Sequence, residues 1–249
     1  MKALESKVAI ITGAAKGIGE STALLFAKEG AKVVVSDIDE ENGKKVTEAI
    51  KKDGGEALFV KSDASKPKDH EELVKKTVDA FGKLDIAVNN AGIGGSLAQT
   101  AEYPVDDWDN VIKLNLSGVF YGTKYQIAEM MKNGGGSIVN IASILGQVGT
   151  ANSPAYVAAK HGVVGLTKTA AIEYAQENIR VNAVGPGYIK TPLLDALDDE
   201  TLEYLVSQHP IGRLGKPEEV AEIILWLASD KASFVTGNYY AVDGGYLAK

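Results

Sequence analysis

Tyr156 and Lys160 lie four residues apart in the segment 153–174, which is rich in Ala, contains Leu and Lys, and therefore favours a helix. Ser153 is a suitable N-cap, and Pro154 fits the first helical turn. Because residues four apart share one face of a helix, the phenol and the ammonium should be neighbours. A nearby positive charge stabilises the phenolate, so we predict that the pKa of Tyr156 falls below its ordinary value of about 10. Such a tyrosine is suited to general acid/base chemistry, whereas an ordinary surface pair is the simpler alternative for an isolated motif of this kind.

The elements that must position this pair alternate between strands and helices along the chain. A β-branched run at 8–11 leads into the glycine turn TGAAKGIG at 12–19, and a helical segment follows. Glycines let the backbone approach a pyrophosphate, and a helix N-terminus favours its charge, so this is the context of a dinucleotide-binding turn. The spacing G-x-x-x-G-x-G is not the commoner G-x-G-x-x-G, so taken alone it also fits a plain turn. The candidate cofactor-binding residues here are Gly13, Lys16, Gly17, Ile18 and Gly19.

A second strand at 32–36 leads to Asp37, 18 residues beyond the last glycine of the turn. A carboxylate about 20 residues after such a turn commonly holds the ribose hydroxyls of a dinucleotide. We predict this role for Asp37 and place the adjacent Ile38 in the same site. The alternative is that Asp37 or Asp39 only caps the following helix, at 40–52.

The charges around Asp37 bear on the choice of cofactor. A carboxylate there would repel the 2′-phosphate of NADP, since like unit charges roughly 4 Å apart repel by about 4 kcal/mol at an effective dielectric constant near 20. Lys16 would attract the same phosphate, but a mobile, exposed lysine offsets only part of the repulsion. We therefore predict NAD as the cofactor, with NADP as the less favoured alternative.

Polar turns also follow the third and fourth predicted strands, at 57–61 and 84–88. In a doubly wound sheet, ligands bind outside the carboxyl ends of the strands, so both turns are candidate cofactor sites. Asp63 can accept a hydrogen bond from an adenine amino group, or it can simply terminate its strand. The candidate cofactor-binding residues in the two turns are Asp63, Ala64, Asn90, Ala91 and Gly92.

Two further polar residues are candidates for the same site. Asn115 lies inside an expected helix at 106–131, although the Asn amide competes for backbone hydrogen bonds. It is either a locally satisfied core residue or the site of a helix kink that frees a carbonyl to hold a water. Ser143 follows a predicted strand at 137–142, where it is either a turn residue or a hydroxyl that holds a substrate carbonyl oxygen.

The last part of the chain continues the alternation. A sixth strand at 179–184 leads through a Gly-Pro-Gly turn into an aperiodic insertion at about 188–216, a candidate lid. A helix at 217–227 and a strand at 239–242 follow. Alternating strands and helices without a linker predict an α/β fold in a single domain, residues 1–249. The candidate cofactor-binding residues in this part are Pro186, Gly187, Ile189 and Thr191.

Composition narrows the classes of function. The chain has 249 residues and a formal net charge of −7, which argues against nucleic acid or an anionic membrane surface as the main partner. It contains no cysteine and only three, widely spaced histidines, so we expect no disulfide, no thiol nucleophile and no metal site. We see no apolar run long enough for a membrane span and no signal peptide, and we expect a cytoplasmic protein.

The motifs TGAAKGIG, NNAG and YVAAK, with Asn115, Ser143 and the Pro-Gly turn in order, make the chain resemble a short-chain dehydrogenase/reductase over essentially its whole length. The resemblance implies a Rossmann-type, doubly wound sheet of seven parallel strands with helices on both faces, and a homotetramer. It also implies an NAD(H)-dependent oxidoreductase that moves a hydride between the cofactor and a carbonyl or carbinol carbon. Tyr156 would be the general acid and base, and Lys160 would lower its pKa and bind the nicotinamide ribose. Ser143 would hold the substrate oxygen, and Asn115 would anchor a water in a proton relay.

The resemblance to this family does not by itself determine which substrate and which cofactor the protein prefers. Asp37 matches NAD-preferring members of the family, whereas Lys16 occupies a position that is often basic in NADP-preferring ones. A rather apolar pocket, to which Val148, Leu194 and Leu205 would contribute, favours simple ketones and secondary alcohols. The alternatives are a 3-oxoacyl-[acyl-carrier-protein] reductase, a sugar or polyol dehydrogenase, and a non-catalytic NAD-binding protein. The candidate substrate-binding residues are Ser143, Leu145, Gln147, Tyr156 and Tyr188.

Overall fold

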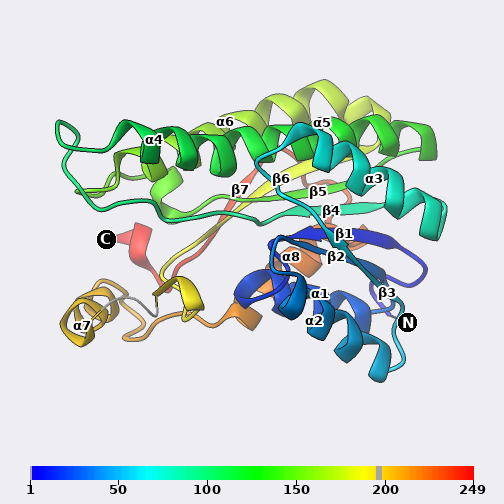
Figure 1. The fold of residues 1–249 in the computed structure, drawn as a ribbon, viewed down its shortest axis with the longest axis horizontal. Helices are drawn as coiled ribbons and strands as arrows, with labels where there is room; N and C mark the ends of the chain where they lie inside the picture. The colour runs from blue at the N-terminus through cyan, green and yellow to red at the C-terminus, as the bar shows by residue number, and fades with distance from the viewer. Residues whose placement is uncertain (1, 195–197) are drawn as a thin grey trace.

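In the computed structural model, which describes residues 2–194 and 198–249, seven strands form one sheet (Figure 1). Their order is β3-β2-β1-β4-β5-β6-β7, and every neighbouring pair is parallel. The seven-stranded parallel sheet that the resemblance implied is therefore confirmed. The strands are β1 (Val8–Thr12), β2 (Lys32–Asp37), β3 (Ala57–Lys61), β4 (Ile86–Asn89), β5 (Gly136–Ile141), β6 (Ile179–Pro186) and β7 (Tyr239–Val242).

Helices cover both faces of this sheet. Figure 1 shows α1, α2 and α8 on one face, α3, α5 and α6 on the other, and α7 beyond the end of the sheet. In the described parts of the chain, no helix is long and apolar enough to cross a membrane. The α-helices are α1 (Gly17–Lys28), α2 (Glu40–Lys52), α3 (Pro67–Phe81), α4 (Val105–Ile112), α5 (Gly118–Met130), α6 (Pro154–Tyr174), α7 (Asp199–Ser207) and α8 (Pro217–Ala228).

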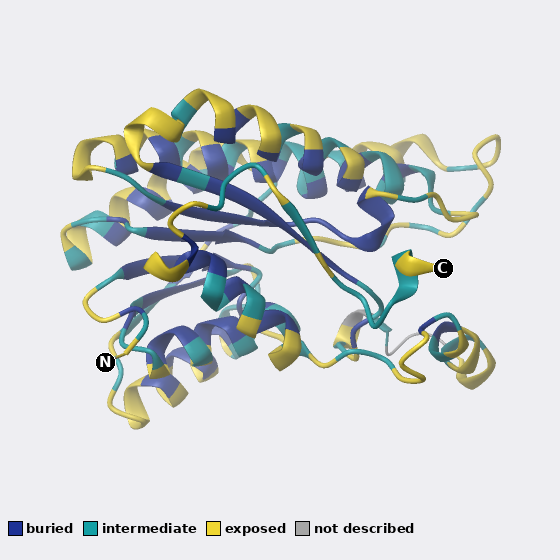
Figure 2. Cartoon of the chain, turned by 180° about the vertical axis from the view of Figure 1, so that it is seen from behind, coloured by how far each residue is buried: buried dark blue, intermediate teal, exposed yellow. Residues whose placement is uncertain are grey.

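The central strands are almost uninterrupted apolar runs because helices cover both faces of the sheet. All five residues of β1 are buried, and Figure 2 shows the middle of the sheet in the buried colour. Successive residues of a strand face opposite layers. Ile11 accordingly packs with Phe26 of α1 and Ile224 of α8, whereas Ile10 packs with Leu73 of α3 and Met130 of α5. Two apolar clusters thus hold the sheet between its helical layers.

The winding of the sheet reverses between β1 and β4. The chain passes from β1 to β2 and β3 on one side, and from β4 to β5, β6 and β7 on the other. The connections that leave the carboxyl ends of β1 and β4 therefore diverge, and such a switch point is where doubly wound sheets bind ligands. The glycine turn leaves β1 and the Asn-rich turn leaves β4, so both predicted cofactor turns meet at this point.

The expected helix at 106–131 is present, but its winding changes around Asn115. A π-helical turn, Lys113–Ser117, separates α4 from α5. Asn115 is buried in this turn, and its side chain is hydrogen-bonded to the backbone of Ile93. The structure thus shows both a satisfied buried amide and a distorted helix, and a freed carbonyl that holds a water stays a prediction. Such π-turns are frequent at functional sites.

The insertion at 188–216 is more regular than predicted. It contains α7, whose N-cap, Asp198, accepts a hydrogen bond of 2.8 Å from the Thr201 N–H. Residues 195–197, which belong to the same predicted insertion, lie outside the described residues. Lys249 of the C-terminal turn binds the backbone carbonyl of Gln208 at 2.8 Å, so the chain end packs beside α7.

A buried amide network joins β4 and β5 to α5 and α6. Asn89 donates hydrogen bonds to Gln126 at 3.0 Å and Asn140 at 2.9 Å, and Gln126 donates back at 2.8 Å. An Asn89→Val substitution leaves buried amides unpaired, at about 1–3 kcal/mol each, so we expect the free energy of unfolding to fall by about 3 kcal/mol. Urea denaturation measures this loss. The exposed Asn133→Ala control should change stability by less than about 0.5 kcal/mol, and equal losses in both variants would contradict the prediction.

Candidate active site

Tyr156 and Lys160 project from the same face of α6, as the spacing predicted. The Lys160 Nζ lies 5.5 Å from the centroid of the Tyr156 ring. Lys160 is only 3% exposed and donates a hydrogen bond of 2.8 Å to the backbone carbonyl of Ile141, at the end of β5. Pro154 begins the helix as expected, but the predicted side-chain cap from Ser153 is not formed. The pair is therefore held in place by packing and by the neighbouring strand.

The ionisation of the pair differs from the prediction. Burial raises the pKa of the Tyr156 phenol above its ordinary value, and a hydrogen bond with Ser143 opposes this rise. Burial lowers the pKa of Lys160 to about 8. The predicted lowering of the Tyr156 pKa by Lys160 is therefore wrong for the protein as described. Desolvation of the phenolate outweighs the attraction of an ammonium group that is directed at the Ile141 carbonyl.

Ser143 lies beside the Tyr156 hydroxyl. It follows β5 and caps a short 3₁₀ turn, in which its Oγ accepts a hydrogen bond of 3.2 Å from the Leu145 N–H. The Tyr239 hydroxyl donates to the Ser143 backbone carbonyl at 2.9 Å and so fixes the backbone from the side of β7. Two hydroxyl groups, one from the turn after β5 and one from α6, are thus hydrogen-bonded to each other, an arrangement that suits the binding of a substrate oxygen.

The Asn115 side chain holds the segment that follows β4 through two hydrogen bonds. Its Oδ1 accepts a hydrogen bond of 2.9 Å from the Ile93 N–H, and its Nδ2 donates one of 2.7 Å to the Ile93 carbonyl. A Cβ on Gly92 would lie 3.1 Å from Asn115 Oδ1 and 3.9 Å from Lys160 Nζ. The π-turn, the Asn-rich turn and α6 therefore meet around Lys160. The sequence did not single out Ile93, because its contribution is made by backbone atoms.

The glycine turn is shaped for close approach to a ligand. Gly13 and Gly17 have φ angles of +62° and +58°, which glycine adopts without strain. A Cβ on Gly19 would lie 2.1 Å from the carbonyl oxygen of Gly13, so the turn has no room for a side chain there. Lys16, the N-cap of α1, forms no side-chain cap, which leaves the first-turn N–H groups for a pyrophosphate. The residues present therefore fit a dinucleotide.

The Asn-rich turn is tied directly to the glycine turn. The Asn90 side chain donates to the backbone carbonyls of Thr12 and Gly13, each at 2.9 Å. The Thr12 hydroxyl in turn accepts hydrogen bonds from the N–H groups of Asn90 at 3.0 Å and Ala91 at 3.2 Å. These bonds hold the two turns in one fixed arrangement across the switch point. Thr12 was overlooked as a site residue, although it directly precedes the first glycine.

The Asp37 carboxylate is held by two backbone N–H groups at the end of β2, from Ala15 at 3.0 Å and Asp39 at 2.9 Å. Lys16 forms an ion pair of 2.9 Å with Asp39, which raises the pKa of Lys16. Hydrogen bonds from Asn42 and Lys16 hold the pKa of Asp39 well below its usual range. Asp39 is also the N-cap of α2, so the capping alternative holds for Asp39. The cation that would attract a 2′-phosphate is thus already paired with a carboxylate.

The other predicted cofactor residues fall into two groups. Asp63 binds the Ser65 N–H at 3.0 Å and Lys66 at 3.1 Å, and the Ala64 carbonyl accepts from His70 at 2.9 Å. Both lie at the end of β3, and their adenine-binding role stays a prediction, as does that of the exposed Ile38.

The second group follows β6 and reaches the glycine turn. A Cβ on Gly17 would lie 3.2 Å from the Thr191 Cγ2, so this segment touches the turn. Pro186, the last residue of β6, and Ile189 are buried, and Gly187 is half-buried. The cofactor-binding role of these residues and of Thr191 stays a prediction.

The predicted substrate-binding residues differ in how far they are buried. Leu145 is buried and Gln147 is exposed, so their contact with a substrate stays a prediction. Tyr188 is half-buried, and its pKa is raised to about 12 by burial and, to a smaller extent, by the phenols of Tyr246 and Tyr156. Its contact with a substrate likewise stays a prediction.

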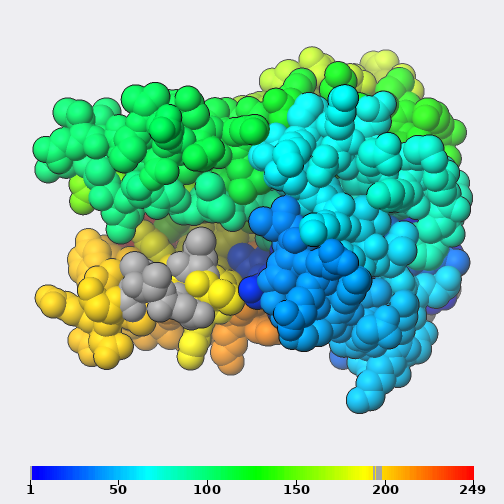
Figure 3. Space-filling model, viewed as in Figure 1, coloured from blue at the N-terminus to red at the C-terminus, as the bar shows by residue number. Residues whose placement is uncertain are grey.

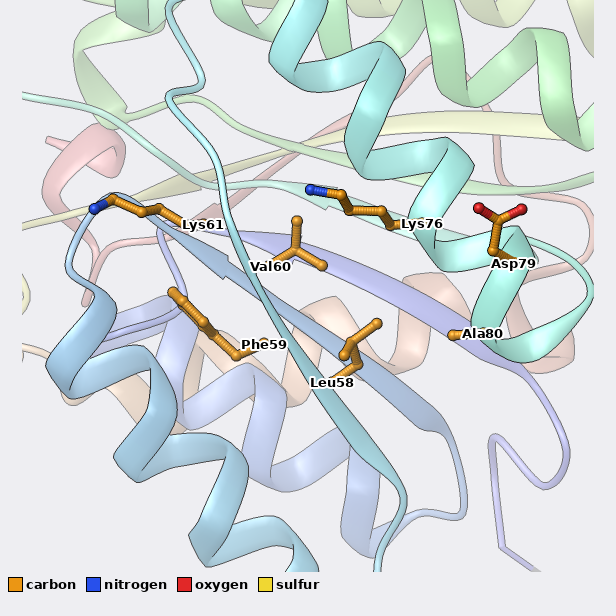
Figure 4. Close-up of a pocket in the computed structure, with 7 residues that line it drawn as sticks. All are labelled: Leu58, Phe59, Val60, Lys61, Lys76, Asp79 and Ala80. Atoms are coloured by element: carbon orange, nitrogen blue, oxygen red, sulfur yellow. The ribbon is translucent and has the colours of Figure 1, made fainter.

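The surface is recessed between the segment around α4 and the segment around α7 (Figure 3). The chain enters the first segment from β4 and the second from β6. A separate pocket of about 410 Å³ lies beside β3, the strand at one edge of the sheet, between this strand and α3. Phe59, Lys61 and Lys76 are among the residues that line it (Figure 4). None of the predicted site residues lines that pocket, so the candidate site is at the switch point and the recess.

Burial of Lys160 makes stability depend on pH. Its pKa is about 8 in the folded protein and 10.5 for the ordinary side chain. Between these values the unfolded chain binds the additional proton, so the free energy of unfolding rises as the pH increases. From about pH 8 to about pH 10 we expect a rise that is about 2 kcal/mol larger than in a Lys160→Met variant, measured by urea denaturation. Identical pH dependence in the two proteins would show that the ammonium group is not desolvated.

A doubly wound parallel sheet with a glycine turn at its switch point defines an α/β protein of the dinucleotide-binding class. A family model described as Enoyl-(Acyl carrier protein) reductase matches residues 13–247. The chain belongs to the short-chain dehydrogenase/reductase family, and it is an oxidoreductase that acts on CH–OH groups with a nicotinamide cofactor. The family resemblance and the enzyme class drawn from the sequence are thereby confirmed.

Similar proteins cover the chain almost completely. A cyclohexanol dehydrogenase of Acinetobacter sp. (strain SE19) is 51% identical, over 98% of this chain and 96% of its own length. A 3-oxoacyl-[acyl-carrier-protein] reductase of Thermotoga maritima is 46% identical, over 98% of this chain and 99% of its own length. The crystal structure of a short-chain type dehydrogenase/reductase from Mycobacterium marinum superposes with a TM-score of 0.95 at 35% identity, covering 99% of this chain and 97% of that one.

Proposed function

We propose that the protein interconverts a ketone and a secondary alcohol with NAD(H), and that Tyr156 is the general acid and base. The observation that supports this most directly is the convergence of the Tyr156 and Ser143 hydroxyls beside the buried ammonium of Lys160. The nicotinamide cofactor supplies or accepts the hydride. A cyclic secondary alcohol is the first substrate to consider, because the relative at 51% identity is a cyclohexanol dehydrogenase.

The chain's own residues handle the substrate oxygen and its proton. During reduction, negative charge develops on the oxygen, and the hydroxyls of Ser143 and Tyr156 donate hydrogen bonds to it. Burial raises the pKa of Tyr156, so the phenol keeps its proton until the substrate oxygen takes it. Lys160 stabilises the phenolate that remains and binds the nicotinamide ribose. Asn115 positions the backbone at Ile93 and anchors a water through which the proton is replaced.

NAD is the proposed cofactor, in preference to NADP. The Asp37 carboxylate stands at the end of β2, where a 2′-phosphate would meet it. Lys16, the residue that would favour NADP, is paired with Asp39 at 2.9 Å. The pyrophosphate would lie against the glycine turn and the first-turn N–H groups of α1.

We also propose that the protein is a cytoplasmic homotetramer, as the family resemblance implies. Large apolar side chains on α4 and α5 support self-association, since Trp108 is 38% exposed and Phe120 is 47% exposed. Sedimentation velocity measures the assembly, and a monomer at micromolar concentration would contradict the proposed tetramer.

A 3-oxoacyl-[acyl-carrier-protein] reductase is the second candidate, supported by the relative at 46% identity. An acidic carrier protein requires a basic surface beside the active-site mouth. The segment 129–136, where Lys132 is paired with Glu129 at 2.7 Å, leads into the amino end of β5, opposite the candidate site, so it does not bear on carrier-protein binding. A small ketone or alcohol is the first candidate because the relative at 51% identity is a cyclohexanol dehydrogenase.

The experiment that separates these functions follows absorbance at 340 nm with cyclohexanone, an acetoacetyl thioester and a ketose, each with NADH and with NADPH. The proposal expects the highest kcat/KM for the cyclic ketone with NADH. A preference for the thioester with NADPH would establish the second candidate instead. A preference for the ketose would identify a sugar dehydrogenase.

A further inference from the structure

His209 is a buried histidine that the proposed reaction does not use. It follows α7 and is only 3% exposed. Its Nδ1 lies 2.7 Å from the backbone carbonyl of Leu205, and its Nε2 lies 3.2 Å from the backbone N–H of Tyr188. One imidazole ring thus joins the end of α7 to the segment that follows β6.

These two hydrogen bonds fix the protonation of the ring. A backbone N–H can only donate, so Nε2 must carry a free lone pair, and a carbonyl can only accept, so Nδ1 must carry the hydrogen. Both partners are satisfied by one tautomer of the neutral imidazole. A second proton on Nε2 would set two donors against each other and break the bond to Tyr188.

The ring also packs between two tyrosines from different parts of the chain. Its centroid lies 5.8 Å from that of Tyr188, at an interplanar angle of 84°, and 5.6 Å from that of Tyr246 in the C-terminal turn. A Cβ on Gly187 would lie 2.9 Å from Nε2, so the absence of a side chain there lets the ring reach the backbone. Three segments that are far apart in sequence therefore meet at His209.

This contact bears on the reaction through Tyr188. Tyr188 is one of the predicted substrate-binding residues, and the phenol of Tyr156 makes a small contribution to the rise in its pKa. We propose that His209 is a positioning residue, whose neutral ring accepts the Tyr188 N–H and so holds Tyr188 as a wall of the substrate pocket. The inference rests on the proposed function, because it takes Tyr188 to contact the substrate.

The charged groups near the ring are bonded elsewhere. Asp243, which packs against Gly187, accepts the N–H groups of Gly245 at 3.0 Å and Leu247 at 2.9 Å. On the α7 side, Lys249 is bound to Gln208. Within the described residues, both ring nitrogens therefore bind backbone atoms, and neither is paired with a carboxylate.

Two substitutions separate positioning from simple packing. His209→Phe keeps an aromatic ring and removes the acceptor, whereas His209→Gln places an amide oxygen where Nε2 stands and does not titrate. With cyclohexanone and NADH at about pH 8, we expect His209→Phe to raise the KM for the ketone about tenfold, with kcat within about threefold of wild type, because a buried N–H loses its partner. His209→Gln should restore the KM for the ketone to within about threefold of wild type, and the KM for NADH should be unchanged in both.

His209→Leu tests the same inference should the phenylalanine variant fail to fold, because it also lacks the acceptor for the Tyr188 N–H. We expect it to raise the KM for the ketone about tenfold and to leave the KM for NADH unchanged. The inference is overturned if a folded variant that lacks the acceptor has the wild-type KM for the ketone, or if that variant and His209→Gln are equally impaired. Failure of the wild type to reduce any ketone would instead reject the proposed function, before any variant is compared.

Discussion

Replacement of Tyr156 by phenylalanine is expected to reduce kcat at least about a thousandfold, because general acid/base catalysis contributes roughly 10²–10⁴-fold and no neighbouring group can take its place. Ser143 can still bind the substrate oxygen, but a serine hydroxyl is too weak an acid to give up its proton at neutral pH. The aromatic ring packs with Val111, Ala155 and Ala159, and phenylalanine preserves these contacts. The folded state and the glycine turn should therefore be unaffected.

The measurement combines steady-state turnover of cyclohexanone with titration of NADH by fluorescence. We expect the dissociation constant for NADH to stay within about threefold of wild type while turnover disappears. Tyr103→Phe is the matched control, since it removes a hydroxyl from a tyrosine of the same apolar cluster and should leave kcat unchanged. If Tyr156→Phe retains a tenth of the activity, the assignment of Tyr156 as the acid and base is refuted.

The regular elements were predictable where local chemistry decides them. The strand at 57–61, the helix at 40–52 and the strand at 239–242 occur with the predicted bounds. A β-branched or aromatic run between polar turns is enough to define such a strand. The helix at 106–131 was also predicted, but its π-turn was not, because Asn115 binds Ile93, 22 residues away, and no local pattern reports a contact of that range.

In the candidate site too, features set by neighbours in sequence were predictable, and features set by residues distant in sequence were not. The common face of Tyr156 and Lys160 follows from helix geometry alone, so the sequence sufficed to predict it. The ionisation of the pair did not follow, because it depends on burial and on the carbonyl of Ile141, which is 19 residues upstream of Lys160. The role of His209 was equally hidden, since both of its hydrogen-bond partners are backbone atoms.

The preference for NADH over NADPH is expected to fall about a hundredfold when Asp37 is replaced by serine. Like unit charges roughly 4 Å apart repel by about 4 kcal/mol at an effective dielectric constant near 20, and solvent screening reduces this at a half-exposed site. The ratio of the kcat/KM values for the two cofactors measures the change. An unchanged ratio in Asp37→Ser would refute the proposed role of this carboxylate.

Two further variants separate the repulsion by Asp37 from the neutralisation of Lys16. Asp37→Asn keeps an acceptor for the Ala15 N–H but loses the charge, so it should shift the ratio in the same direction as serine does. Asp39→Asn leaves the Asp37 charge in place and releases Lys16 from its 2.9 Å ion pair, so kcat/KM for NADPH should rise by about 1.5-fold to fivefold, the range for one exposed ion pair. Lys16→Ala should remove that gain, because an alanine has no charge to offer a phosphate. If Asp39→Asn has no effect while Asp37→Ser does, Lys16 is too mobile to matter, and direct repulsion by one carboxylate selects the cofactor.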